Sequence, residues 1–234
     1  PIETMEAWSM VGGALIMHVV SLGMGESIAD VVWTVESLAA LTYLSVVASA
    51  LGLLRPGHYP PELLPAFYVQ DALVLVLGVP ALVVGLRDAR RGSLRGRLVW
   101  LGALAYATYL WTTVGLQVPF DRFFLGYVLL VALSLFTLVG ATVGTDADAT
   151  RRALAGHVSE RVYGGFLAFV AAGLAALWLA ELVPATLTGT PPLLVEEVGP
   201  QALVSHFLDL SVVVPGLLVA AVWLRRGRPW GYVL

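Results

Sequence analysis

The chain of 234 residues contains no cysteine and no lysine, and charged residues make up only 12% of it. The missing cysteine excludes disulfide bonds, thiolate metal ligands and cysteine nucleophiles. The missing lysine excludes a Schiff base on a lysine side chain. A soluble domain carries about 25% charged residues, so the low charge and the 59% hydrophobic content predict a membrane protein. The net charge of −3 argues against a nucleic-acid partner.

Long apolar stretches fill most of the sequence. A membrane-spanning helix needs about 20 mostly apolar residues. We therefore predict one domain over residues 1–234, an all-α bundle of seven transmembrane helices, with spans near 8–24, 31–54, 67–86, 98–117, 124–144, 163–186 and 203–224. The segment before the first span is acidic rather than basic, which predicts a retained helix rather than a cleaved signal peptide. The apolar residues Gly231–Leu234 resemble the start of an eighth helix.

The arginines predict the orientation of the bundle. Eleven of the 13 arginines lie in alternate connections, at residues 87–97, at 145–162 and after residue 224. The positive-inside rule assigns these connections to the cytoplasm. The prediction is a multi-pass protein of the cell membrane with its N-terminus outside and its C-terminus in the cytoplasm. Arginine without lysine is typical of a GC-rich prokaryotic genome.

Ionisable residues inside a span are costly and are functional candidates by default. They are His18, Glu36, Asp71, Glu181, His206 and Asp209. With a rise of about 1.5 Å per residue, the last four fall in the outer half of the membrane. His206 and Asp209 also share a helix face, because they are three residues apart. We predict an outward-facing pocket for a proton or a polar ligand, lined by Gln70, Asp71, Thr112, Glu181, His206 and Asp209.

A simpler interpretation applies to two of these carboxylates. Asp71 and Glu181 lie near the outer ends of their spans, where they could hold loops in place or pair with Arg55 and Arg122. Two prolines inside spans, Pro80 and Pro215, should distort their helices, because each removes a backbone hydrogen bond.

Two resemblances bear on the fold. The segment Phe207–Ser211 resembles the last helix of microbial rhodopsins, but the chain has no lysine, so retinal is excluded as a cofactor. The pieces Phe67–Asp71, Arg90–Tyr106, His206–Leu210 and Arg225–Tyr232 resemble a group of uncharacterised prokaryotic multi-pass membrane proteins over about residues 67–234. That resemblance implies a membrane fold and adds no activity.

Three function classes remain open from the sequence. The first is a transporter, channel or sensor for a proton, a cation or a small polar ligand, since a histidine among carboxylates titrates near neutrality. The second is an intramembrane hydrolase with zinc on His206, Asp209 and Asp71, because catalytic zinc takes three protein ligands and a water. The third is a structural or accessory subunit. The sequence favours a function without catalysis and identifies no catalytic residue, and it does not predict the oligomeric state.

Overall fold

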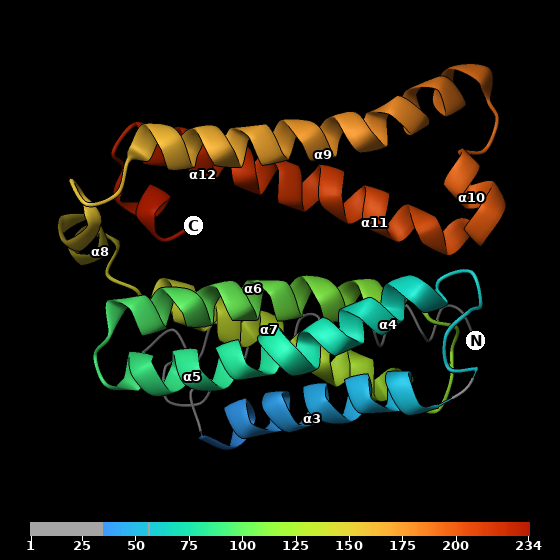
Figure 1. Cartoon of the computed structure of the whole chain (residues 1–234), viewed down its shortest axis with the longest axis horizontal. Coiled ribbons are helices and arrows are strands. Elements are labelled where there is room, and N and C mark those ends of the chain that lie inside the picture. The colour runs from blue at the N-terminus through green and yellow to red at the C-terminus, as the bar shows by residue number, and fades with distance from the viewer. Residues whose placement is uncertain (1–34, 56) are drawn as a thin grey trace, which may run out of the picture.

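The computed structural model describes residues 35–55 and 57–234, and these residues form a set of helices (Figure 1). In chain order they are α3 (Val35–Leu54), α4 (Leu64–Leu73), η1 (Val74–Gly78), α5 (Val79–Arg90), α6 (Leu94–Gln117), α7 (Phe124–Val143), α8 (Ala147–Leu154), α9 (Glu160–Thr188), α10 (Leu193–Val198), η2 (Pro200–Ala202), α11 (Leu203–Leu208), η3 (Asp209–Val213), α12 (Val214–Arg225) and η4 (Pro229–Tyr232). The described part has no β-strand, only an isolated bridge between Ala155 and Val158. The all-α prediction is confirmed for these residues.

Five helices of the described part are long and apolar enough to cross a membrane. They are Leu64–Arg90, Leu94–Gln117, Phe124–Val143, Glu160–Thr188 and Pro200–Arg225. Each coincides with one of the last five predicted spans, so the membrane class is confirmed. The predicted span 31–54 corresponds to α3, which contributes the shorter apolar helix Ala39–Leu54. The predicted span 8–24 with His18, and the side chain of Glu36, lie outside the described residues. The count of seven spans and the orientation stay predictions.

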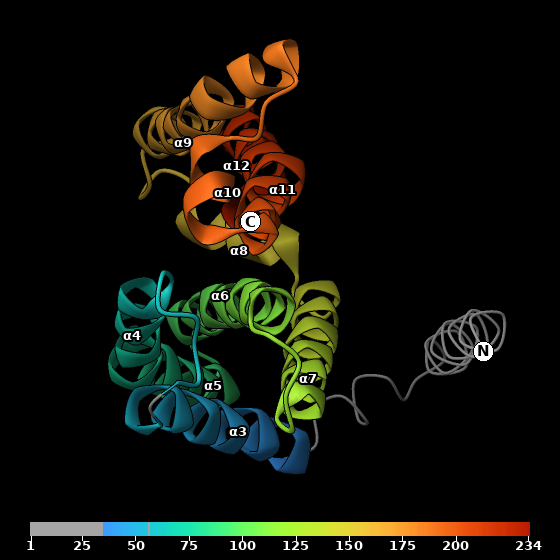
Figure 2. The same ribbon diagram turned by 90° about the vertical axis from the view of Figure 1, so that its right-hand side faces the viewer.

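The helices are arranged in two groups. Helices α3, α4–α5, α6 and α7 form one bundle, and α9 with α11–α12 forms a second group beside α6 (Figures 1 and 2). At one end of the molecule the Gln117 side chain joins them, since its Nε2 donates to Ser205 Oγ at 3.0 Å and to the Gln201 carbonyl at 3.1 Å. At the other end α8 connects the groups and contacts η4.

The core of the first bundle lies around α6. Trp100, Trp111 and Leu104 on this helix are among the most deeply buried side chains, each at most 1% exposed. Helix α5 approaches α6 closely at Gly85, where an added Cβ would lie 2.9 Å from the Trp100 backbone nitrogen. Small residues at such contacts let membrane helices pack backbone against backbone.

A motif of a π-helical turn followed by a twelve-residue helix occurs twice. The turn η3 begins at Asp209, 135 residues after η1 begins at Val74, and both turns are five residues long. The helices α5 and α12 that follow are each twelve residues long and have a proline, Pro80 or Pro215, at their second position. Figure 1 shows the two segments running in the same direction along the molecule.

The correspondence continues past the end of each helix. Both helices end at a pair of arginines followed by a glycine with positive φ, Gly92 at 82° and Gly227 at 61°. Farther on, Gly96 packs against the backbone of Ala89, and Gly231 packs against that of Leu224. All these pairs keep the same separation, so the chain contains an internal parallel repeat. The sequence alone did not predict this repeat.

The prolines explain the π-helical turns. A proline inside a helix lacks the N–H donor, and its ring clashes with the carbonyl four residues earlier. A π-helical turn inserts one extra residue and removes that conflict. The predicted distortion at Pro80 and Pro215 therefore takes the form of a π-helical turn before each proline. The repeat also makes Asp71 and His206 equivalent, since each lies three residues before its turn.

Candidate functional site

The first polar group surrounds Asp209, at the start of η3. Its carboxylate accepts a hydrogen bond from the Tyr109 hydroxyl of α6 at 2.7 Å. It accepts a second from the Trp178 indole N–H of α9 at 2.8 Å. Asp209 is only 6% exposed. Two donors from two neighbouring helices thus compensate a carboxylate that is removed from water, and they join α6, α9 and η3.

His206 lies one turn before Asp209 and is 2% exposed. Its ring packs against Trp178, with 4.1 Å between the ring centroids. Its Nε2 lies 3.6 Å from Oε2 of Glu181 on α9 and has no hydrogen-bond partner. An unpartnered buried nitrogen beside a carboxylate is unusual, because buried polar atoms are normally satisfied.

The other ring nitrogen of His206 fixes the tautomer of the neutral ring. Nδ1 lies 2.9 Å from the Ala202 carbonyl oxygen. A carbonyl oxygen can only accept, so Nδ1 must carry the proton and Nε2 must present its lone pair. We assign this tautomer from the hydrogen-bond geometry. Two acceptors, Nε2 of His206 and Oε2 of Glu181, therefore face each other across 3.6 Å.

Glu181 also holds the segment of the chain that follows α9. Its Oε1 accepts a hydrogen bond from the Leu194 backbone N–H at the start of α10, at 2.6 Å. The Glu181 side chain is 25% exposed, so one side of the carboxylate is open while the other faces the buried imidazole. The carboxylate thus links the surface, the α10 backbone and His206.

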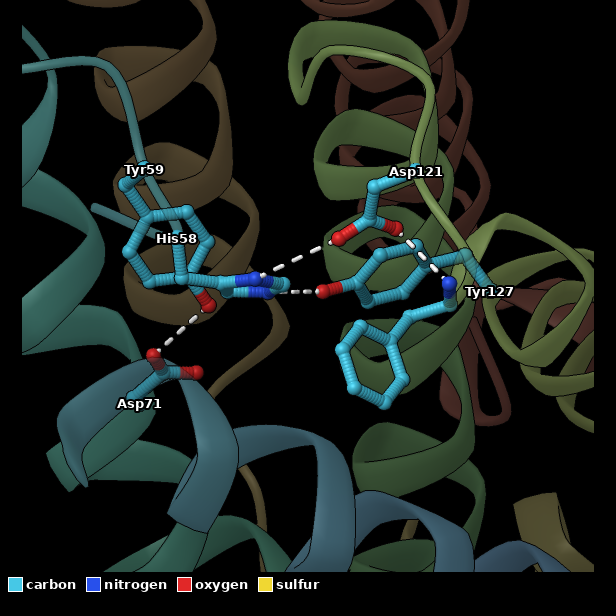
Figure 3. Close-up of polar contacts among 6 residues, drawn as sticks. His58, Tyr59, Asp71, Asp121 and Tyr127 are labelled. Atoms are coloured by element: carbon cyan, nitrogen blue, oxygen red, sulfur yellow. Dashed lines mark hydrogen bonds and ion pairs between the residues drawn. The ribbon is translucent and has the colours of Figure 1, made fainter. Parts of the chain in front are cut away.

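The second polar group surrounds Asp71 in the first bundle (Figure 3). Asp71 is 3% exposed, and its Oδ2 accepts a hydrogen bond from the Tyr59 hydroxyl at 2.8 Å. Tyr59 belongs to the connection between α3 and α4 and stacks on Phe67 with 4.5 Å between centroids. Gly52 of α3 makes room for this contact, because an added Cβ would collide with both Asp71 and Tyr59. Burial, and then the Asp71 carboxylate, raise the pKa of Tyr59 well above its usual range, so the phenol remains a donor.

His58, beside Tyr59, belongs to the same region and also has a ring nitrogen without a hydrogen-bond partner, Nδ1 (Figure 3). Its Nε2 forms a 2.6 Å hydrogen bond with the Tyr127 hydroxyl, and its Nδ1 lies 3.6 Å from Oδ2 of Asp121. Burial lowers the pKa of His58, the Asp121 carboxylate opposes this, and the Arg55 charge lowers it further. The neutral imidazole therefore fits this position, where it joins the α3–α4 connection to α7.

The predicted pocket residues divide between these two groups. Glu181, His206 and Asp209 lie together around Trp178, whereas Asp71 is bonded to Tyr59 in the first bundle. Thr112 does not point its hydroxyl at either group, because it donates to the Thr108 carbonyl of its own helix at 2.7 Å. Gln70 lies beside Asp71 in the chain, and its buried Oε1 has no hydrogen-bond partner.

The predicted loop-holding role of Asp71 and Glu181 is visible in the structure. Asp71 fixes the α3–α4 connection through Tyr59, and Glu181 fixes the start of α10 through Leu194. The predicted partners Arg55 and Arg122 instead lie over the Phe123 ring, at 5.2 and 5.3 Å from its centroid.

Two contributors were not predicted as site residues. Trp178 lies three residues before Glu181 on α9, so the two share a face, as His206 and Asp209 do. Matching these two pairs could have indicated the contact between α9 and α11. The sequence contains no comparable pattern for Tyr59, because the position of this residue depends on the path of the connection between α3 and α4.

Among the described residues, no group of three or more histidine, aspartate or glutamate side chains lies close enough together to hold a metal ion. Comparison of the chain with protein-family models, with curated proteins and with solved structures finds no match.

Proposed function

We propose that the protein is a proton-responsive membrane protein of the sensor or transporter class, with His206 as the group that takes up the proton. The observation that carries this proposal is the buried Nε2 of His206, which the Ala202 carbonyl leaves as the unprotonated nitrogen of the neutral ring and which faces Glu181 Oε2 at 3.6 Å without a hydrogen-bond partner. Such a nitrogen is a proton acceptor with a counter-charge already in place.

Protonation changes the interaction between the two side chains. In the neutral state two acceptors face each other and repel. A proton on Nε2 turns the contact into a charge-assisted hydrogen bond, which is shorter and about twice as strong as a neutral one. The change draws Glu181 towards His206 and so alters its bond to the Leu194 N–H at the surface. The proton on a buried ring is thereby coupled to the outer segment of the chain.

The neighbourhood of His206 contains further groups that respond to its charge. Asp209 lies on the same helix and Glu181 on α9, and the Tyr109 hydroxyl from α6 hydrogen-bonds to Asp209. Both carboxylates place negative charge beside the imidazole. The exposed side of Glu181 gives protons a route from the outer surface, which is consistent with uptake from outside the membrane.

Trp178 provides a direct test. A protonated imidazole quenches indole fluorescence on contact, and the His206 and Trp178 rings lie 4.1 Å apart. Tryptophan emission of the protein in lipid nanodiscs should fall as the pH is lowered. Subtracting the emission of Trp178→Phe isolates the contribution of Trp178 from those of the other tryptophans. We expect this component to be quenched by acid in the wild-type protein and to lose its pH dependence in His206→Gln.

The exposed His157 supplies a matched control, because His157→Gln removes a histidine far from Trp178 and should leave the quenching intact. If the Trp178 component keeps its pH dependence in His206→Gln, the proposal is wrong. A structural role, favoured by the loop contacts of Asp71 and Glu181, then becomes the better interpretation.

A further inference from the structure

The internal repeat places two helix pairs in equivalent positions, and these pairs differ in how closely they pack. In the second half, α9 and α12 are in close contact. A Cβ on Gly164 would lie 3.0 Å from the Ala221 carbonyl oxygen, and Ala171, Ala220 and Ala221 are at most 2% exposed. Small residues therefore close the space between these two helices.

The corresponding pair in the first half, α3 and α5, leaves a groove. It has a volume of about 510 Å³ and lies open to the outside of the bundle. Its apolar walls include Tyr43 and Val46 from α3 with Val83 and Leu86 from α5, and Tyr43 is 69% exposed. Leu86 lies 135 residues before Ala221, so at this contact a larger side chain stands where the other pair has a small one.

The groove is amphipathic along its length. Arg87 and Arg90, in the last turn of α5, line one end of it, and the apolar residues continue towards the membrane interior. Arg87 has Asp88 beside it, but the 3.9 Å pair is exposed and therefore weak. Arg90 forms no ion pair with any described residue. Positive charge thus dominates the membrane-surface end of a groove whose interior is apolar.

We infer that this groove binds an anionic phospholipid, with the phosphate group on Arg87 and Arg90 and an acyl chain between α3 and α5. Arginine binds phosphate oxygens through paired N–H donors. Basic pockets between transmembrane helices are suited to anionic lipid head groups. Charge and shape therefore favour the same ligand, and the site is independent of the proton-binding group at His206.

Native mass spectrometry of the purified full chain in detergent can test this inference. The probes are phosphatidylglycerol and phosphatidylcholine with identical acyl chains. Each basic residue near an anionic lipid contributes about fivefold to affinity, so Arg87→Gln with Arg90→Gln should weaken phosphatidylglycerol binding by about 30-fold. The control, Arg91→Gln with Arg95→Gln, makes the same charge change in the same connection outside the groove and should weaken binding only a fewfold.

A second pair of variants tests the acyl-chain part of the site. Val83 and Val84 are adjacent and similarly exposed, 48% and 50%, but only Val83 lines the groove. Val83→Trp should block lipid binding, and Val84→Trp should not. Both variants keep all charges and lie on the surface of α5, so neither should prevent folding.

Four results would overturn the inference. They are equal binding of phosphatidylcholine, displacement of the lipid by inorganic phosphate at equal concentration, equal losses from the two arginine pairs, and equal behaviour of the two tryptophan variants. A fifth is an efficient cross-link in membranes between Val46→Cys and a cysteine placed within residues 8–24, because the chain itself would then fill the groove.

Discussion

The two buried histidines that face carboxylates differ in what holds their other ring nitrogen. In the first half Nε2 of His58 bonds to the Tyr127 hydroxyl, which can donate, so the proton of the neutral ring can lie on Nδ1 and face Asp121. In the second half the Ala202 carbonyl holds that proton on Nδ1 of His206, and Nε2 presents its lone pair to Glu181. The neutral His58 is therefore compatible with its carboxylate, whereas His206 becomes so only by binding a proton.

The carboxylates at the two sites also differ. Asp209 accepts hydrogen bonds from Tyr109 of α6 and Trp178 of α9, whereas Asp71 accepts one from Tyr59 of the α3–α4 connection and has Ser49 of α3 close by. Asp209 therefore holds two neighbouring helices to η3, while Asp71 holds a connection to α4. Mutation of the donors tests this difference.

The largest effect on stability should come from Tyr59→Phe. It removes the Tyr59 donor from the buried Asp71 carboxylate, and a hydrogen bond to a charged group contributes about 1.5–3 kcal/mol. Thermal unfolding in nanodiscs should show this loss. Tyr109→Phe is the matched change at Asp209 and should cost less, because Trp178 still donates to Asp209. Equal losses for the two variants would contradict the comparison.

Gly52→Ala should have the next largest effect. The added Cβ collides with Asp71 and Tyr59, so the hydrogen bond between them must lengthen or break, at a cost of about 1–3 kcal/mol. Gly173→Ala on α9 is the control, since an added Cβ there meets no atom within 4 Å. We expect the control to be neutral or slightly stabilising, because alanine is the better helix former. Thermal unfolding of both variants in nanodiscs tests this prediction.

Acid should loosen the α3–α4 connection. The pKa of His58 is lowered in the folded protein, mainly by burial. The unfolded or opened connection therefore binds a proton more readily than the folded one, and stability falls as the pH drops below the ordinary histidine value of about 6.5. The protection factors of the amides at residues 57–63, which correct for the slower intrinsic exchange at lower pH, should fall on acidification. His58→Asn should abolish that fall, and an unchanged fall would exclude His58 as its cause.

The smallest effect on stability should come from Glu181→Gln. The amide oxygen can still accept the Leu194 N–H, and the amide NH2 can donate to Nε2 of His206, so unfolding should change by less than about 1 kcal/mol. The acid quenching of Trp178 should nevertheless be strongly reduced, because the counter-charge for a protonated His206 is gone. If Glu181→Gln is stable and keeps the full acid quenching of Trp178, Glu181 has no part in the proposed mechanism.

The amino-acid sequence allowed the membrane class and most spans to be predicted, because apolar length alone determines them. It also identified His206 and Asp209 as a pair on one face. The repeat escaped prediction since its halves share mainly a proline and an Arg-Arg-Gly sequence, while interchangeable apolar residues fill the rest. The separation of Asp71 from Asp209 depends on helix packing. The contact of Tyr59 with Asp71 depends on the path of a connection, which local sequence does not determine.

The tautomer of His206 is the most direct test of the proposed proton site. Nitrogen NMR of histidine-labelled protein at about pH 9, above the ordinary histidine range, distinguishes the two neutral forms, and His206→Gln assigns the signal. We expect the proton on Nδ1, bonded to the Ala202 carbonyl, and a second proton on Nε2 after acidification. A neutral ring protonated on Nε2 would already donate to Glu181, and that result would contradict the assignment of His206 as the proton acceptor.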